Sequence, residues 1–257
     1  MSNISQSTES DVAEVVALLA PSNLDYVASI FALSRLGFAV LLLSNRLATE
    51  AYVSLLQKTN CRRIISSENH AKAVAAIQAD MQISQYPLFK QSDYDIEPAL
   101  YPRFPRQMSG PSASNRTAFI IHSSGSTGLP KPIFQSQGAC LSNYSSSFGY
   151  RAFLTLPLYH NHGLSSFFRA IYSGKEISMF NANLPLSGSN LIEAMTAVNP
   201  ESFHGVPYAL KLLAETERGV QVLKGCKLVL FGGSSCPDDL GDRLVEAGVY
   251  LVGHYGA

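Results

Sequence analysis

The sequence has no excess of charge of either sign. Among its 257 residues, 19 are lysine or arginine and 19 are aspartate or glutamate, so the formal net charge at pH 7 is zero. A protein that holds nucleic acid or an anionic membrane through a general positive field needs a surplus of basic residues. We therefore expect neither partner and favour a small molecule as the ligand.

Cysteines and long apolar runs are also scarce. The chain has four cysteines, and none of them forms a CxxC pair, which favours buried reduced thiols over a zinc site or a redox motif. The apolar run from Phe38 to Leu43 is far shorter than the roughly 20 residues that a membrane span needs. Because the N-terminal residues lack the basic and apolar regions of a signal peptide, we expect a soluble cytoplasmic protein.

What the sequence does contain is typical of a globular α/β protein. Hydrophobic residues make up 46% of the chain and charged residues 15%, which argues against disorder. Apolar runs alternate with helical patterns, so we expect a mostly parallel sheet covered by helices. Strands are expected at 15–20, 38–43, 63–66, 117–122, 152–156, 228–231 and 249–252, and helices at 25–36, 49–59, 138–148, 164–172 and 237–247. Ser22 or Asn23 is expected to cap the first helix.

The domain organisation follows from a change in composition. Four prolines recur among polar residues between 91 and 116, where the apolar periodicity disappears. We therefore expect a polar tail at 1–11, a first α/β part at 12–90, a Pro/Ser-rich connection at 91–116 and a second α/β part at 117–257.

The most informative segment runs from His122 to Lys131 and reads HSSGSTGLPK. It leaves an apolar strand and supplies small residues, hydroxyl groups and one lysine. The two glycines let several backbone N–H groups turn toward anionic oxygens, and Lys131 adds a mobile positive charge. These properties favour a loop that holds polyphosphate.

Other loops of similar composition fit less well. A Walker loop needs Gly and Lys to be adjacent, but a Leu-Pro pair separates Gly128 from Lys131. A serine hydrolase needs GxSxG around its nucleophile, and neither Ser124 nor Ser126 has that context. A flexible linker rarely follows a buried strand, and no GxGxxG follows the first strand as a dinucleotide-binding domain requires.

The segment Ser123 to Lys131 resembles the phosphate-binding signature of the adenylate-forming superfamily, which contains acyl- and aryl-CoA synthetases, adenylation domains of peptide synthetases, and luciferases. Later segments resemble the other motifs of that family in the same order: LPLYHNHG at 156–163, VPY at 206–208, FGGSS at 231–235, and YGA at the end, which resembles the start of YGxTE. VALLAPSNLDYV and SRLGFAVLLLSNRL also resemble fungal peptide-synthetase-like carboxylic acid reductases.

This resemblance implies a reaction in two steps. A carboxylate attacks the α-phosphate of ATP to give acyl-AMP and pyrophosphate, and the thiol of phosphopantetheine or CoA then takes the acyl group. The resemblance also implies layered parallel-sheet subdomains with the site in a crevice between them, Mg²⁺ as a cofactor, and a carrier domain as a partner in a full-length protein.

The resemblance also assigns residues to roles. The β- and γ-phosphates are expected to contact Ser123, Ser124, Gly125, Ser126, Thr127, Gly128 and Lys131. The adenine site is expected to include Gly232, Gly233, Ser234, Tyr255 and Gly256. The acyl pocket is expected to include His160, which would orient the carboxylate, together with His204 and Gly205.

Several of these residues have alternative interpretations. His160 and His204 also fit structural histidines, and the two glycines at 232–233 also fit an ordinary tight turn. His160 and His162 form an HxH pair, but no further ligand lies at a spacing that indicates zinc. Because no carboxylate lies at 159–162 to pair with an ammonium group, we expect an aryl or acyl acid as the substrate rather than an α-amino acid.

The chain ends before several motifs of the family. The Thr-Glu of YGxTE, whose glutamate is the expected Mg²⁺ ligand, would lie beyond Ala257, as would the mobile C-terminal domain with its lysine. We therefore expect the N-terminal region of a larger enzyme that is inactive and poorly soluble on its own. The alternative is a noncatalytic remnant that binds nucleotide weakly.

Overall fold

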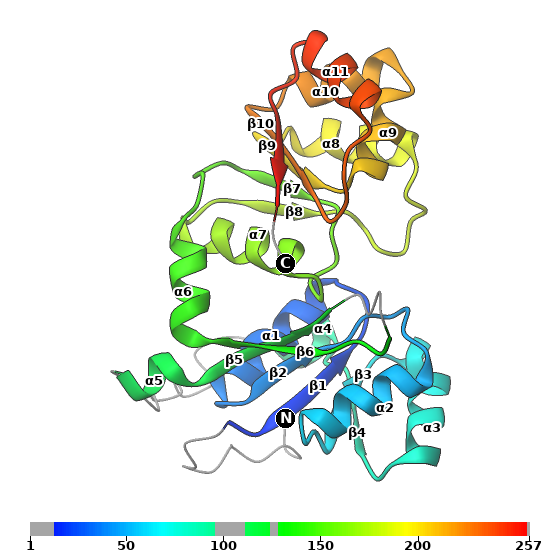
Figure 1. The fold of residues 1–257 in the computed structure, drawn as a ribbon, viewed down its shortest axis with the longest axis vertical. Coiled ribbons are helices and arrows are strands. Elements are labelled where there is room, and N and C mark those ends of the chain that lie inside the picture. Colours follow the sequence, from blue (N-terminus) through cyan, green and yellow to red (C-terminus); the bar gives the residue numbers. More distant parts are fainter. Residues whose placement is uncertain (1–12, 96–110, 124–127, 256–257) are drawn as a thin grey trace. The chain divides into compact units, whose positions relative to one another are not determined.

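The protein is described here by a computed structural model covering residues 13–95, 111–123 and 128–255 (Figure 1). The chain divides into two compact units, residues 1–141 and 142–257. Both units combine parallel strands with helices, which confirms the predicted α/β class. No helix in the described part of the chain is long and apolar enough to cross a membrane.

The first unit is built on a six-stranded sheet with the strand order β4-β3-β1-β2-β5-β6. All neighbouring strands are parallel except β5 and β6, which form an antiparallel pair. The strands are β1 (Val15–Leu19), β2 (Ala39–Leu42), β3 (Arg63–Ser66), β4 (Ser84–Pro87), β5 (Thr117–His122) and β6 (Pro132–Ser136). The helices are α1 (Leu24–Arg35), α2 (Thr49–Lys58), the 3-10 helix η1 (Glu68–His70), α3 (Ala71–Asp80), α4 (Gln91–Tyr94) and α5 (Pro111–Asn115). Helix α6 (Gln137–Ser145) begins in this unit and contains the boundary at residue 141.

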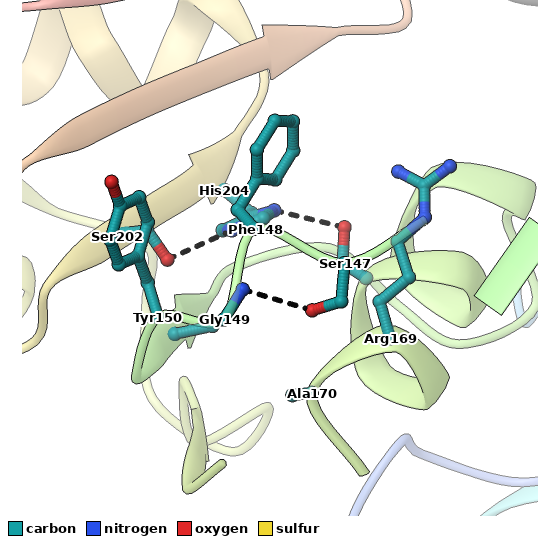
Figure 2. A pocket seen from close by; sticks show the side chains of 10 residues that line it. Ser147, Phe148, Gly149, Tyr150, Arg169, Ala170, Ser202 and His204 are labelled. Atoms are coloured by element: carbon teal, nitrogen blue, oxygen red, sulfur yellow. Dashed lines mark hydrogen bonds between the residues drawn. The ribbon is translucent and has the colours of Figure 1, made fainter. Parts of the chain in front are cut away.

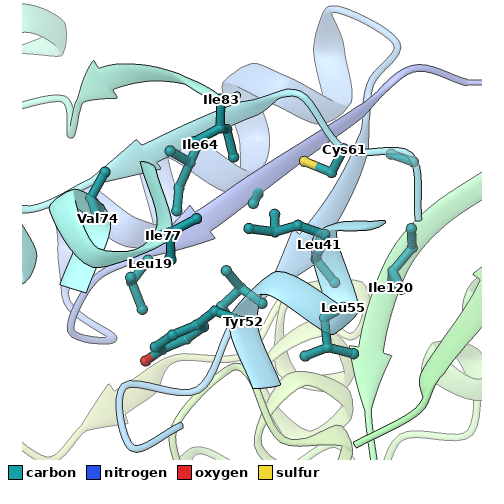
Figure 3. Close-up of a cluster of buried hydrophobic side chains, with 14 of the residues drawn as sticks. Leu19, Leu41, Tyr52, Leu55, Cys61, Ile64, Val74, Ile77, Ile83 and Ile120 are labelled. Atoms are coloured by element: carbon teal, nitrogen blue, oxygen red, sulfur yellow. The ribbon is translucent and has the colours of Figure 1, made fainter. Parts of the chain in front are cut away.

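The core of the first unit lies between its sheet and the helices α2 and α3. Figure 3 shows Leu19, Leu41 and Ile64 of the strands packed with side chains of these two helices. Alternate residues of the same strands, such as Leu18 and Leu42, are also fully buried. Since successive side chains of a strand point to opposite faces, both faces of this sheet are covered, as is typical of parallel sheets.

The first helix begins where its capping residue predicts. The Asn23 side chain accepts a hydrogen bond of 3.0 Å from the backbone N–H of Tyr26, so Asn23, rather than Ser22, is the N-cap of α1. Asp25 in the first turn and Arg35 in the last turn both complement the helix dipole.

The second unit is built on a five-stranded parallel sheet with the order β11-β10-β9-β7-β8. Its strands are β7 (Ala152–Leu154), β8 (Ile177–Met179), β9 (Ser202–Gly205), β10 (Leu228–Gly232) and β11 (Leu251–His254). Its helices are α7 (Asn161–Tyr172), α8 (Gly188–Val198), α9 (Pro207–Ala214), α10 (Glu217–Lys224) and α11 (Asp238–Glu246).

The two faces of this second sheet differ in character. Phe203 of β9 packs into an apolar cluster with residues of α8 and α9, including Leu191 and Leu210. Because side chains alternate along a strand, Ser202 and His204 point to the opposite face, where His204 contacts Ser166 of α7. The interface between β9 and α7 is therefore polar, although it is buried.

The structure divides the chain at a different place from the predicted boundary in residues 91–116. The strand β5 pairs with β2 and therefore belongs to the first sheet, so residues 117–141 join the first unit. The expected connection contains the short helices α4 and α5, and residues 96–110 lie outside the described residues. Strand β6 was not predicted, and the expected helix at 138–148 is observed as α6 over 137–145.

Three of the four cysteines are buried and all four are free thiols, as the sequence predicts. Cys61, Cys140 and Cys226 are buried, whereas Cys236 is partly exposed. Burial raises the pKa of the Cys61 and Cys226 thiols to about 11, because the thiolate would lose its hydration.

We predict that Asn23→Ala lowers the free energy of unfolding of the first unit by about 1 kcal/mol, because it leaves an N–H at the start of α1 without its acceptor. Urea denaturation followed by circular dichroism measures this loss. Asn23→Asp is the control, since aspartate caps helices equally well. Equal loss in both variants would mean that capping is not the cause.

Candidate functional site

The loop between β5 and β6 is closed at its base by two hydrogen bonds. The Ser123 N–H donates to the Lys131 carbonyl at 3.0 Å, and the Lys131 N–H donates to Ser123 Oγ at 3.0 Å. His122 faces Pro132 in the antiparallel register just below this closure. The hairpin therefore fixes the distance between the two ends of the loop.

His122 connects this loop base to the core of the first unit. Its Nε2 accepts from the Ser44 N–H at 3.2 Å, and its Nδ1 lies 3.1 Å from the Ser123 carbonyl oxygen. The Ser44 carbonyl in turn accepts from the buried Tyr52 hydroxyl at 2.7 Å. Burial lowers the pKa of His122, and the hydrogen bond to the Ser123 carbonyl opposes this shift. The imidazole is therefore neutral at physiological pH.

The structure brings the described members of the expected phosphate loop together at this hairpin. Ser123 and Lys131 form its base, and the Lys131 side chain is exposed. Gly128 has φ +149, a backbone conformation that residues with a Cβ rarely adopt. The other four expected residues, Ser124, Gly125, Ser126 and Thr127, lie outside the described residues.

The expected site residues of the second unit gather around the start of α7 and the ends of β9, β10 and β11. His160 is the N-cap residue of α7 and is exposed, and its ring lies edge-on to Tyr159 at a centroid distance of 4.7 Å. Gly163 follows in the first turn of α7. A Cβ at Gly163 would collide with the Pro157 carbonyl oxygen, so the motif needs glycine there.

Three imidazole rings form the centre of this region. The ring of His162 lies 4.9 Å from that of His254 and 6.3 Å from that of His204. These rings come from α7, β11 and β9, elements that are far apart in the sequence. No group of three or more His, Cys, Asp or Glu side chains within the described residues is arranged to hold a metal ion.

His204 is a buried histidine with both ring nitrogens hydrogen-bonded. It lies within β9. Nδ1 pairs with Ser166 Oγ at 3.0 Å and Nε2 with Ser202 Oγ at 3.1 Å (Figure 2). Burial is the main reason that its pKa is lowered to about 3, and His162 and Arg169 add to the shift. These bonds match the expected alternative of a structural histidine.

His204 also lines a small cavity of about 20 Å³. Arg169 of α7 and the hydroxyls of Ser147, Ser166 and Ser202 border the same space (Figure 2). A cavity of this size holds about one water molecule or one ligand oxygen. No carboxylate of the described residues forms an ion pair with Arg169, and burial lowers the pKa of its guanidinium.

His162 differs from His204 because its ring nitrogens have no protein partner. Both are buried, and neither has a hydrogen bond within the described structure. Its pKa is lowered to about 4, chiefly by burial and further by His254 and Arg169. Unsatisfied buried nitrogens cost free energy, which marks His162 as a group that a ligand can satisfy.

Gly232 leaves the space that this ring occupies. A Cβ at Gly232 would lie 2.7 Å from the His254 carbonyl oxygen and 3.0 Å from His162 Nδ1. Gly232 faces His254 in the parallel register of β10 and β11. The glycine of the FGGSS segment is therefore required by close packing and not only by a turn.

The remaining expected residues lie at the edge of this region. Gly233 has φ +86, and Ser234 beside it is exposed. Gly205 ends β9 and is buried next to Thr155. Tyr255 is 97% exposed, and Gly256 lies outside the described residues.

Sequence reasoning did not include His254 among the site residues and considered His162 only as half of an HxH pair. The available signal was the position of His254 directly before the YGA segment, because parallel neighbouring strands end at the same edge of a sheet. Arg169 was also missed. It lies seven residues after His162, which places both on one face of α7.

Comparison with known protein families shows to which family a chain with these motifs belongs. Residues 9–257 match the family described as AMP-binding enzyme. The chain belongs to the AMP-binding enzyme family. A curated adenylate-forming reductase from Aspergillus terreus is 28% identical over 264 residues, which cover 94% of this chain and 24% of that protein. A carboxylic acid reductase from Neurospora crassa is 25% identical and covers 92% of this chain.

Solved structures of AMP-binding enzymes share the fold. The N-terminal domain of FACL13 from Mycobacterium tuberculosis, bound to an inhibitor, matches with a TM-score of 0.80 at 17% identity and covers 99% of this chain and 64% of that one. The anthranilate CoA ligase AuaEII in complex with anthranoyl-AMP matches with a TM-score of 0.79 at 18% identity, and the match covers 96% of this chain and 49% of that one. The chain spans about a quarter of the length of the reductases that it matches.

We predict that Gly232→Ala lowers the free energy of unfolding of this AMP-binding domain by about 1–3 kcal/mol, because the added Cβ forces apart β11 and the His162 ring. Gly241→Ala is the matched control, since a Cβ at that helical position meets nothing within 4 Å. Urea unfolding of both variants measures the difference. Similar stability of the two variants would contradict the packing role.

We predict that His204→Leu lowers the free energy of unfolding by about 2 kcal/mol at pH 7.5, because Ser166 and Ser202 lose their partner. Between pH 7.5 and 5.5 the free energy of unfolding of the native protein should also fall by about 1 kcal/mol more than that of the variant. The reason is that the unfolded histidine binds a proton below about pH 6.5, whereas folded His204, with a pKa of about 3, stays neutral.

Urea titrations at both pH values measure these two effects. His160→Leu is the control, because His160 is exposed and should affect neither quantity by more than about 0.5 kcal/mol. An unchanged pH dependence in His204→Leu would show that His204 does not stay neutral in the folded protein.

Proposed function

We propose that the chain forms the nucleotide- and acid-binding part of an enzyme that activates a carboxylic acid with ATP, giving an acyl-adenylate and pyrophosphate. The hairpin loop of the first unit carries this proposal. Its base is held by two hydrogen bonds, its single lysine is exposed, and its residues match the signature of the family to which the chain belongs.

The described part of the loop fits a polyphosphate. Lys131 has no carboxylate partner within the described residues, so its charge is free to meet an anion. A Cβ at Gly128 would meet nothing within 4 Å, so the backbone at this position is open. Mg²⁺ would neutralise part of the phosphate charge.

The imidazole region of the second unit is the proposed acid pocket. His162 supplies ring nitrogens without a protein partner, and Arg169 supplies a cation without an ion pair. Both features favour an anionic or hydrogen-bonding ligand. An ammonium group would find no carboxylate among these side chains and would face the positive charge of Arg169, so we propose an aryl or acyl acid as the substrate rather than an α-amino acid.

The second half-reaction is proposed to be transfer to a thiol. The names adenylate-forming reductase and anthranilate CoA ligase of two similar proteins support such a step. We propose phosphopantetheine on a carrier domain, or CoA, as the acceptor in a full-length protein.

A second candidate function is nucleotide binding without turnover. It needs only the loop of the first unit, with its exposed Lys131, and not the proposed acid pocket. The two functions differ in pyrophosphate exchange, which requires adenylation and not only ATP binding.

We predict that the chain binds ATP and that Lys131→Met weakens this binding about tenfold, because one charge-assisted contact to phosphate is lost. Isothermal titration measures the dissociation constants. Lys58→Met, an exposed lysine at the end of α2, is the matched control and should leave the affinity unchanged. Equal effects of the two substitutions would refute the role of the loop.

A pyrophosphate-exchange assay on the same protein then distinguishes between the two functions. Exchange of radiolabelled pyrophosphate into ATP that depends on an aryl or acyl acid, but not on α-amino acids, supports adenylation. ATP binding without any such exchange, both in this chain and in a fusion with the C-terminal domain of a related AMP-binding enzyme, favours nucleotide binding without turnover.

A further inference from the structure

We propose that His122 positions the base of the phosphate loop and does so only as the neutral imidazole protonated at Nδ1, so that nucleotide binding weakens in acid. This inference rests on the proposed function of the loop. It assigns a role to a residue that precedes the expected phosphate contacts and that the family resemblance did not include.

The first observation is that His122 links two segments distant in the sequence. Ser44 follows β2, and its N–H donates to His122 Nε2 at 3.2 Å across 78 positions of the chain. The other ring nitrogen lies 3.1 Å from the carbonyl oxygen of Ser123. Ser123 then bonds Lys131 twice, so the ring is one residue from the closure of the loop.

The second observation is that the Ser44 side of this link is itself held rigidly. The Ser44 carbonyl accepts from the Tyr52 hydroxyl at 2.7 Å in a buried hydrogen bond, and Ser44 Oγ accepts from the Arg46 N–H at 3.3 Å. Tyr52 also packs in the apolar core beneath α2. The His122 ring therefore links the start of the loop to a residue, Ser44, that is itself fixed by the core.

These partners allow one protonation state. A carbonyl oxygen only accepts, so Nδ1 must carry the hydrogen that points to Ser123. A backbone N–H only donates, so Nε2 must be free of hydrogen to accept from Ser44. A second proton would place an N–H at Nε2 against the N–H of Ser44, and this hydrogen bond would break.

The surroundings keep the ring neutral near pH 7. Burial lowers the pKa of His122, and only the Ser123 carbonyl opposes the shift. On the neighbouring elements, α2 carries Glu50, Tyr52 and Lys58, and the adjoining loops carry Arg46 and Lys131. None of them contributes to the shift of the His122 pKa. The ring therefore becomes protonated only at acidic pH, below the ordinary histidine pKa of about 6.5.

Two substitutions of His122 distinguish a role in positioning the loop from a role in packing alone. Glutamine at this position offers an amide oxygen as an acceptor for the Ser44 N–H, but it does not titrate. Leucine fills similar space and accepts nothing. We predict that at pH 8.0 His122→Gln binds ATP within about threefold of the native chain, whereas His122→Leu binds about tenfold more weakly because the Ser44 N–H is left unpaired.

The pH profile provides the decisive readout. ATP itself gains a proton near pH 6, so both the native chain and His122→Gln should lose some affinity in acid. By pH 5.0 the native chain should lose about threefold more than His122→Gln, because only its ring is protonated. Isothermal titration at each pH measures the affinities, and circular dichroism confirms that each variant is folded.

A measurement without nucleotide distinguishes failure of this inference from failure of the proposed function. In NMR titrations the amide signals of Ser123 and Lys131 should shift with a midpoint below pH 6.5 in the native chain and stay constant in His122→Gln. If the native chain does not bind ATP at pH 8.0, the proposed function fails. If the amide signals or the ATP affinities of the native chain and His122→Gln change in parallel, the positioning role of His122 is overturned.

Discussion

The pairing of β5 with β2 is the interaction on which the first unit depends. Val40 faces Phe119 and Leu41 faces Ile120, so two strands separated by more than 70 positions lie side by side. Because both strands run in the same direction, their carboxyl ends meet at one edge of the sheet. Ser44 and His122 come together there, and the loop begins at the next residue. The pairing of the strands thus positions the start of the loop, and the Ser123 side chain adds one bond to its closure.

The second unit uses the two faces of its sheet for different purposes. The face toward α8 and α9 is apolar and supplies the buried area that stabilises the unit. The face toward α7 carries Ser202 and His204 opposite Ser166, and all three are buried and hydrogen-bonded. A polar interface of this kind stabilises less than an apolar one of equal area, because its hydrogen bonds only replace those made to water. These hydrogen bonds fix the orientation of the polar groups, whereas both ring nitrogens of the neighbouring His162 lack a partner within the described residues.

Local patterns in the sequence predicted most of the strands and the first helix, because hydrophobic periodicity and capping depend on neighbouring residues. The strand at 63–66 is observed at the predicted residues, and Asn23 was one of the two expected caps. Strand β6 was missed because Pro132–Ser136 is an exposed edge strand with little apolar alternation, stabilised by its pairing with β5.

The part of the site that depends on long-range strand pairing was harder to predict from the sequence. The motif residues were predicted from their resemblance to a family, but the approach of His254 to His162 depends on the register of β10 and β11 and on the missing side chain at Gly232. The division into compact units differs from the predicted boundary for the same reason. A Pro-rich stretch indicated a boundary, whereas a strand beyond that stretch returns to the first sheet.

The closure of the β5–β6 loop by Ser123 and Lys131 separates two properties of the protein that often change together. The backbone bonds at this closure belong to the hairpin, so the register of the strands is set before any residue inside the loop contributes. The closing bonds involve only Ser123 and Lys131, so they do not depend on the identity of the other loop side chains. If the loop binds phosphate as proposed, selection or engineering can alter ligand preference while these bonds and their contribution to thermal stability are kept.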